Sequence, residues 1–381
     1  MKKCCLLVLL LINFCGAKSQ IRKAVEIGKV DSLYSKILKE ERTITVYLPD
    51  NFNPTFKYPV AYVLDGESFF HFYTGVSSFL ANNSIIPDMI IVGITNTDRS
   101  RDFTLPSDSS SNYKPNGGGE KFISFLGKEL IPFIEEKYNV APFRLVLGHS
   151  VAGLLVANIL VKYPALFNSY IALDPAIWWK NSDINKNAPN FLKPNSLKNR
   201  IFFLAMANSN PVGISNSRKI ANDTTGYTNA MKSVVHFDEL LNKHKETGLQ
   251  NTFKYYPNEN HNSVPLIATY DALKTLFSFY KRPGFQILTD SSATVLENHY
   301  KMLSEKMGYT ILPSTTDISG LAWRSKVLDK NYKRAKMFLE MHIRLYPNDA
   351  NGYIEMARYY DELNDQKSAA KFLEQAKQKN K

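Results

Sequence analysis

Apolar positions between residues 42 and 282 fall into short runs separated by longer stretches with helical spacing. Several runs are apolar on both faces, which is typical of strands that helices cover on both sides. The predicted strands are residues 42–49, 58–65, 89–95, 143–148, 169–174, 200–207 and 252–257. The predicted helices are residues 119–138, 151–163, 229–245 and 264–280. This alternation predicts a doubly wound, mostly parallel α/β sheet.

The pattern changes after Pro283, where helical spacing continues without predicted strands. The sequence FLE at residues 338–340 recurs at residues 372–374, an offset of 34 that resembles a tetratricopeptide repeat. About one and a half such repeats are too few to be stable alone. We therefore expect their apolar side chains to pack against the rest of the chain, as a helical cap, or against a protein partner. These side chains include Phe338, Leu339, Phe372 and Leu373.

The chain begins as a secretory signal does. Two lysines precede the apolar run CCLLVLLLINF, and small residues follow it, so we predict a signal at residues 1–19 with cleavage after Ser19. The run is shorter than the roughly 20 residues of a membrane span. A lipid anchor on Cys15 is the alternative. The remaining chain is predicted to form an α/β domain over residues 24–282 and a small all-α tail over residues 290–381.

Cysteine use and charge narrow the function classes. Cys4, Cys5 and Cys15 all lie within the predicted signal, so the mature protein would contain no cysteine nucleophile or thiolate metal site. The formal charge of +12 comes from scattered lysines and arginines, which favours a solvated surface over nucleic-acid binding. We expect an exported bacterial protein, periplasmic or extracellular, that uses no cofactor or metal and spans no membrane.

The segment LGHSVAGLL at residues 147–155 is a candidate nucleophile elbow. It nearly matches G-x-S-x-G, although Ala152 stands where the second glycine would be. A predicted strand leads into it and a predicted helix follows at once, which is the order that exposes a serine hydroxyl on a strained turn. Ser150 is therefore the candidate nucleophile.

A serine hydroxyl needs a base to accept its proton. In hydrolases with this elbow the histidine follows the nucleophile and the acid along the chain. His261 lies in PNENHNSV, after the last predicted strand and before the last helix of the α/β domain. We predict that His261 is the base.

Five segments together carry a family resemblance. In chain order they are VLDGESFF, NTDRSRDFTLP, LGHSVAG, DPAIWW and NENHNSVP. They resemble the esterase branch of the α/β-hydrolase superfamily, which includes ferri-siderophore esterases, esterase D-related S-formylglutathione hydrolases and secreted mycolyltransferases. The resemblance covers residues 24–281. It implies an α/β-hydrolase fold, a covalent acyl-enzyme and a small-molecule ester substrate.

The same resemblance implies roles for individual residues. It makes Ser150 the nucleophile and His261 the base, and it places the oxyanion hole at the backbone N–H groups of Val151 and Glu67. It also implies substrate contacts at the mouth of the site and on a nearby loop, from Trp178, Trp179, Arg99 and Arg101.

The acid departs from the family pattern. The strand at residues 200–207 is followed by Asn-Ser-Asn, and the first carboxylate after it is Asp223, which we take as the acid. Asp174, one strand earlier, is an alternative. A Ser–His dyad oriented by Asn208 or by a backbone carbonyl is another. Loss of the acid would also fit a different function, a non-catalytic binding protein that presents its helical tail to a partner.

Overall fold

The computed structural model describes residues 25–209, 220, 223 and 228–379, so the predicted signal lies outside the described residues. Eight strands form one sheet in the order β1-β2-β4-β3-β5-β6-β7-β8. Strand β2 is antiparallel to both of its neighbours, β1 and β4, and all other neighbouring pairs are parallel. The strands are β1 (Lys29–Ser35), β2 (Glu40–Tyr47), β3 (Tyr58–Leu64), β4 (Ile90–Ile94), β5 (Val140–His149), β6 (Ser169–Leu173), β7 (Ile201–Ala207) and β8 (Gln250–Tyr256). The predicted mostly parallel α/β sheet is confirmed.

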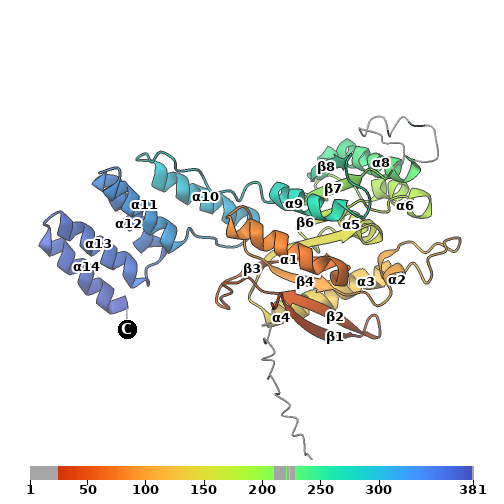
Figure 1. The fold of residues 1–381 in the computed structure, drawn as a ribbon, viewed down its shortest axis with the longest axis horizontal. Coiled ribbons are helices and arrows are strands. Elements are labelled where there is room, and N and C mark those ends of the chain that lie inside the picture. The colour runs from red at the N-terminus through yellow and green to blue at the C-terminus, as the bar shows by residue number, and fades with distance from the viewer. Residues whose placement is uncertain (1–24, 210–219, 221–222, 224–227, 380–381) are drawn as a thin grey trace, which may run out of the picture.

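Helices cover both faces of this sheet (Figure 1). They are α1 (Gly66–Asn82), α2 (Arg99–Phe103), α3 (Gly119–Phe125), α4 (Ile131–Lys137), α5 (Val151–Lys162), α6 (Trp179–Asn187), α8 (Asn229–Lys243) and α9 (Val264–Leu276). Within the described part of the chain, no helix is both long and apolar enough to cross a bilayer.

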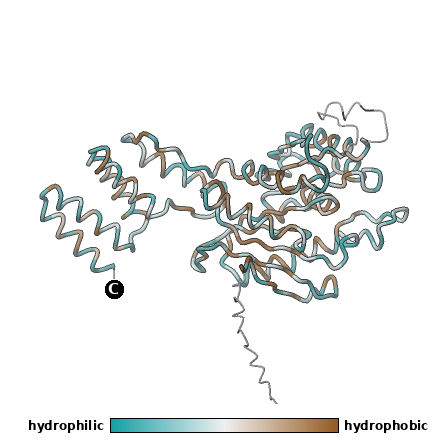
Figure 2. The backbone as a smooth tube through the Cα atoms, viewed as in Figure 1, coloured by the Kyte–Doolittle hydropathy of each residue, from teal (hydrophilic) through white to brown (hydrophobic). Residues whose placement is uncertain are grey.

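Alternate side chains along the central strands enter two separate cores. Tyr62 and Leu64 pack with α5 on one face of the sheet, whereas Ala61 and Val63 pack with α1 and α9 on the other. Every residue of β3 is buried, which explains why its sequence is apolar throughout. Figure 2 shows this pattern along the backbone: the strands are mostly hydrophobic, and the helices and loops around them are more hydrophilic.

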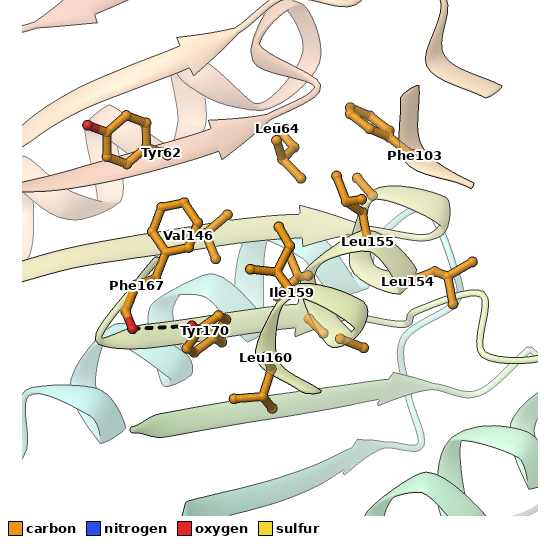
Figure 3. Close-up of a cluster of buried hydrophobic side chains, with 14 of the residues drawn as sticks. Tyr62, Leu64, Phe103, Val146, Leu154, Leu155, Ile159, Leu160, Phe167 and Tyr170 are labelled. Atoms are coloured by element: carbon orange, nitrogen blue, oxygen red, sulfur yellow. Dashed lines mark hydrogen bonds between the residues drawn. The ribbon is translucent and has the colours of Figure 1, made fainter. Parts of the chain in front are cut away.

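Helix α5 is the most deeply buried helix near the predicted elbow. Residues 151–161 are all buried, and Leu155 and Ile159 pack against side chains of β3 and β5 (Figure 3). The buried Tyr170 hydroxyl donates to the Phe167 carbonyl at 3.2 Å, which closes the turn after the helix. The segment that follows Ser150 is therefore a rigid part of the core.

The C-terminal part of the chain is helical and extends away from the sheet (Figure 1). Its helices are α10 (Ser292–Met307), α11 (Thr315–Val327), α12 (Tyr332–Leu345), α13 (Ala350–Glu362) and α14 (Gln366–Lys379). The helical tail is present as predicted. Its identity as a tetratricopeptide repeat stays a prediction.

The packing of the tail differs from the expectation. Phe338 and Leu339 are buried in a core that the tail forms from its own helices, and Phe372 packs against that core. Leu373 is 46 % exposed. The expectation is wrong for Phe338 and Leu339, because neighbouring helices of the tail cover them. A contact of the exposed Leu373 with a partner stays a prediction.

Contact with the α/β domain is made by the end of α10 and the segment after it. Met307 is buried in the core beneath α1 and α9, and Tyr309 and Ile311 pack on its edge. Arg282 also forms an ion pair with Asp317 of α11. The docking surface therefore combines a small apolar contact with polar links, among them the ion pair of Arg282 and a hydrogen bond between the His299 side chain and the Tyr280 backbone.

Met307→Ala is expected to lower the free energy of unfolding by about 2–3 kcal/mol, because Met307 is 1 % exposed and its removal leaves a cavity at the docking surface. Leu373→Ala is the matched control on the exposed side of the tail and is expected to change stability by less than about 0.5 kcal/mol. Urea unfolding of both variants measures the difference. Equal effects would mean that Met307 contributes no more than a surface residue.

Candidate active site

One edge of the sheet carries the candidates Ser150 and His261, the alternative acid Asp174, and also Asp65, for which no role was predicted. Asp65 follows β3, Ser150 follows β5, Asp174 follows β6 and His261 lies in the loop after β8. Because β3, β5, β6, β7 and β8 are parallel, their carboxyl ends meet at the same edge. Ligands of open α/β sheets bind in the crevice outside that edge.

Ser150 stands on a strained turn between β5 and α5. Its backbone has φ 60° and ψ −120°, a conformation that non-glycine residues rarely adopt. Three backbone hydrogen bonds hold it: its N–H donates to the Leu173 carbonyl at 3.0 Å, and its carbonyl accepts from Leu154 and Ala176 at 3.0 and 2.9 Å. This is the geometry of a nucleophile elbow.

The small residues around Ser150 explain why alanine replaces one glycine of the motif. A Cβ on Gly148 would lie 2.4 Å from the Ala152 carbonyl oxygen, so only glycine fits there. A Cβ on Gly153 would lie 2.9 Å from the Pro175 side chain. Ala152 itself is fully buried in the core. The close approaches thus occur at positions 148 and 153, and a methyl group at position 152 is accommodated.

His261 pairs with Asp174. The His261 Nδ1–H donates to Asp174 Oδ2 at 2.6 Å. The other carboxylate oxygen accepts from the Ala207 N–H at 2.9 Å, and Ser209 Oγ lies 3.5 Å from Oδ2. Asp174 is nearly buried, whereas the His261 side chain is 43 % exposed. The pair therefore has an anchored acid and an imidazole that solvent and a ligand can reach.

The preference for Asp223 as the acid is corrected by this geometry. Asp223 accepts a short hydrogen bond from Thr228, and its carbonyl accepts from Lys232 at 2.6 Å. Part of the loop around it lies outside the described residues. His261 pairs instead with Asp174, whose backbone, at φ 41°, turns its carboxylate across the end of β7. The sequence analysis expected the acid after β7, whereas Asp174 follows β6, so its role as the acid is a proposal.

The loop that carries His261 is held at both ends. The Asn208 N–H donates to the Glu259 carbonyl at 2.8 Å, and its side-chain amide donates to the Pro257 carbonyl at 3.0 Å. Asn260 Oδ1 accepts from the N–H groups of Asn262 and Ser263 at 2.9 and 3.1 Å. Asn208 thus orients the loop of His261, rather than its imidazole.

The predicted oxyanion donors both lie in the first turn of a helix. Val151 begins α5 and Glu67 is the second residue of α1, where backbone N–H groups lack an acceptor within the helix. The Glu67 carboxylate accepts from the side chain and backbone N–H of Asn96 at 2.7 and 3.2 Å. The Glu67 side chain is thereby turned to Asn96, which is consistent with a purely backbone role.

The two arginines of the neighbouring loop have different partners. Arg99 forms a bidentate ion pair with Asp65 at 2.7 and 2.9 Å, and its Nη2 donates to the His149 carbonyl at 3.2 Å. Arg101 pairs with Glu40 and Asp102. Its hydrogen bonds with Glu40, and then with Asp102, raise the pKa of Arg101. The expected substrate contact at Arg101 is corrected, because its guanidinium is committed to two carboxylates.

The two tryptophans also differ. Trp179 is 2 % exposed and its indole N–H donates to the Pro106 carbonyl at 2.9 Å. Its predicted place at the mouth of the site is wrong, because it packs in the core. Trp178 is 41 % exposed in the loop that begins at Asp174. A substrate contact at Trp178 stays a prediction.

His149 is a site residue that the sequence analysis does not identify. Its Nε2 lies 2.8 Å from the His261 carbonyl oxygen, and its ring centroid lies 4.4 Å from that of His261. Burial, followed by the nearby His261, lowers the pKa of His149 to about 4. Its position next to Ser150 is a sequence signal, but its contact partner is remote along the chain.

This buried, neutral histidine makes stability depend on pH. The pKa of a histidine in the unfolded chain is about 6.5, whereas that of folded His149 is about 4. Between these two pH values the unfolded state binds a proton at His149 and the folded state does not. Stability from this group is full above about pH 6.5 and is lost as the pH falls toward 4. We expect the wild-type protein to lose about 2–3 kcal/mol more than His149→Gln between pH 7 and 4.5, measured by urea unfolding. Parallel pH curves would contradict this assignment.

Part of the chain is similar in sequence to known esterases. Residues 35–212 match the family described as "Putative esterase". Ferri-bacillibactin esterase BesA of Bacillus subtilis is 30 % identical over 190 residues, which are 44 % of this chain and 65 % of that protein. The chain thus spans a little under two thirds of the length of this curated relative. Both matches are to esterases, and each covers less than half of this chain.

Solved structures share the fold. An IroE-like serine hydrolase from Shewanella oneidensis aligns with a TM-score of 0.68 and 28 % identity, covering 84 % of this chain and 99 % of that one. An uncharacterised protein from Capnocytophaga ochracea aligns with a TM-score of 0.66 and 19 % identity, covering 91 % of this chain and 93 % of that one. The second likeness concerns the fold alone.

Proposed function

We propose that this protein is a serine ester hydrolase in which Ser150 is the nucleophile, His261 the base and Asp174 the acid. The observation that carries the proposal is the 2.6 Å pair of His261 with Asp174, on the same sheet edge as the strained turn at Ser150. The esterase relatives support the reaction class. The pair also weakens the case for a non-catalytic binding protein, which rested on a missing acid.

The reaction follows from these roles. Ser150 Oγ attacks the ester carbonyl carbon while its proton passes to His261 Nε2. The tetrahedral intermediate collapses, the C–O bond to the alcohol breaks, and His261 returns the proton to the leaving alcohol. Water then attacks the acyl carbon and gives a proton to His261. The bond between that carbon and Ser150 Oγ breaks, His261 returns the proton to Oγ, and the carboxylic acid leaves. Asp174 stabilises the imidazolium that forms in each half of the reaction.

Negative charge develops on the carbonyl oxygen in both steps. We assign its stabilisation to the backbone N–H groups of Val151 and Glu67, since each lies at the start of a helix whose dipole favours an anion. Loss of one such donor typically costs about 2.7–4 kcal/mol in transition-state stabilisation. A side-chain substitution at Glu67 leaves its N–H in place and should have little effect on this term.

The substrate class we propose is a siderophore ester. A relative is named ferri-bacillibactin esterase, and a formal charge of +9, which is +12 less the three lysines of residues 1–19, would attract an anionic ferric chelate. The exposed Trp178 is the proposed aromatic contact for such a ligand. We also propose that the chain is exported, on the basis of residues 1–19.

The helical tail carries a separate proposal. We infer that residues 24–282 form the catalytic domain and that residues 290–381 offer a surface to a protein partner. A cavity of about 560 Å³ in the tail, lined by residues that include Trp323 and Arg358, supports this second role. Trp323 is 55 % exposed there.

The test of the enzymatic proposal is covalent labelling with a fluorophosphonate probe, which reacts with an activated serine whatever the substrate. We expect the wild-type protein to be labelled at Ser150 and Ser150→Ala to remain unlabelled. Mass spectrometry of ferri-bacillibactin after incubation then tests the substrate class. A folded wild-type protein that resists the probe would refute the hydrolase, whereas labelling without siderophore cleavage would refute only the substrate.

A further inference from the structure

His149 is in direct contact with the candidate base. It is the last residue of β5, immediately before Ser150, and is 7 % exposed. Its Nε2 lies 2.8 Å from the backbone carbonyl oxygen of His261. A carbonyl only accepts hydrogen bonds, so Nε2 carries the proton and donates.

The imidazole of His149 also supports the ring of His261. The two ring centroids are 4.4 Å apart with an interplanar angle of 39°. Phe69 of α1 packs on the His149 ring edge-to-face, with centroids 5.5 Å apart. His149 therefore lies between Phe69, which is partly buried against the core, and the candidate base.

The backbone carbonyl of His149 also takes part in a second set of contacts, with Arg99. This carbonyl accepts from Arg99 Nη2 at 3.2 Å, and the same guanidinium grips Asp65 through two hydrogen bonds. Asp65 immediately precedes α1, whose first turn contains Glu67. One residue thus links the nucleophile turn, the loop of the base and the segment of the proposed oxyanion donor.

The charge state of His149 suits this place. The titratable and charged groups that face it are His261, Asp174 and Arg99, and burial is the main reason that the pKa of His149 falls. A neutral ring can lie beside His261 when that imidazole becomes positively charged. A protonated His149 would repel it.

We propose that His149 is a positioning residue, which fixes the backbone and ring of His261 so that its Nε2 is aligned to accept the proton of Ser150. This inference rests on the proposed function. Two attachments then hold the base: Asp174 binds its Nδ1–H and His149 binds its backbone carbonyl. A base displaced by about 1 Å can lose about 10²-fold in rate.

A pair of substitutions separates the hydrogen bond from the ring contact. His149→Phe keeps an aromatic ring but removes the donor, whereas His149→Gln keeps an N–H donor and removes the ring. We expect His149→Phe to lower kcat for p-nitrophenyl acetate by about 10- to 100-fold with KM within about threefold of wild type. We expect His149→Gln to stay within about threefold of wild-type kcat. Titration of active sites with the fluorophosphonate probe corrects each rate for the folded fraction.

Hydrogen exchange of residues 257–263 gives a readout that does not depend on catalysis. Without the tether from His149, this loop should exchange faster in His149→Phe than in wild type, and His149→Gln should restore slow exchange. Wild-type kcat in His149→Phe, or equal losses in both variants, would overturn the positioning role. If the proposed function itself failed, Ser150→Ala would hydrolyse p-nitrophenyl acetate at the wild-type rate. The tether from His149 would still be tested by hydrogen exchange, because unchanged exchange of residues 257–263 in His149→Phe would refute it.

Discussion

Ser150→Ala is expected to lower kcat for hydrolysis of p-nitrophenyl acetate by about 10⁴- to 10⁶-fold. The strained turn projects one hydroxyl at the sheet edge, and alanine removes the atom that would form the acyl-enzyme. His261→Ala is expected to cause a loss of the same size, because the hydroxyl is a poor nucleophile without a base. Steady-state kinetics of purified protein measures both losses.

Matched substitutions make this test specific. Ser209→Ala removes a hydroxyl that lies 3.5 Å from the Asp174 carboxylate and is expected to change kcat by less than about tenfold, since it removes one long contact. Circular dichroism and thermal unfolding establish that each variant is folded. If Ser150→Ala or His261→Ala kept more than about a tenth of the wild-type rate, the role assigned to that residue would be wrong.

Asp174→Asn is expected to lower kcat by up to about 10⁴-fold. The Asp174 carboxylate accepts the Nδ1–H of His261 at 2.6 Å and leaves Nε2 as the proton acceptor. An asparagine amide can donate to Nδ1 instead, which favours the wrong tautomer of the imidazole. The effect should fall mainly on kcat, because Asp174 is nearly buried and has no proposed contact with substrate.

Asp223→Asn is the comparison that decides between the two carboxylates. Asp223 bonds to Thr228 in the structure, so its substitution is expected to change kcat by less than about tenfold. Equal, small losses in both variants would favour a Ser–His dyad. A large loss in Asp223→Asn alone would return the acid to the residue favoured by the sequence.

Most of the sheet could be predicted because burial on two faces leaves a local signal. Several predicted strands are runs of apolar residues, and β3 is buried at every position. Strand β1 was missed because its sequence, KVDSLYS, is polar and lies at the edge of the sheet, mostly exposed. Helix α1 was missed as well, since its sequence mixes glycine, serine and aromatic residues of low helix propensity.

The tail illustrates the same limit. Helical spacing identified its helices, but not the surface on which they pack. The spacing of Phe338 and Leu339 predicted an apolar helix face that another surface must cover. In the structure, neighbouring helices of the tail cover it. Hydrophobic spacing reports that a side chain is buried, not which surface buries it.

The sequence alone determined Ser150 and His261 as candidates, because a nucleophile elbow is a local object: a buried strand, a tight turn and a helix in immediate succession. Only the tertiary structure decided their surroundings. Asp174 reaches His261 across 87 positions of the chain, through a backbone turn that carries its carboxylate over the neighbouring strand. Two further contacts depend in the same way on how parallel strands bring distant loops together. They are the contact of His149 with His261 and the burial of Trp179, whose indole N–H donates to the Pro106 carbonyl. Such contacts follow from strand order and loop direction, which no short stretch of sequence encodes.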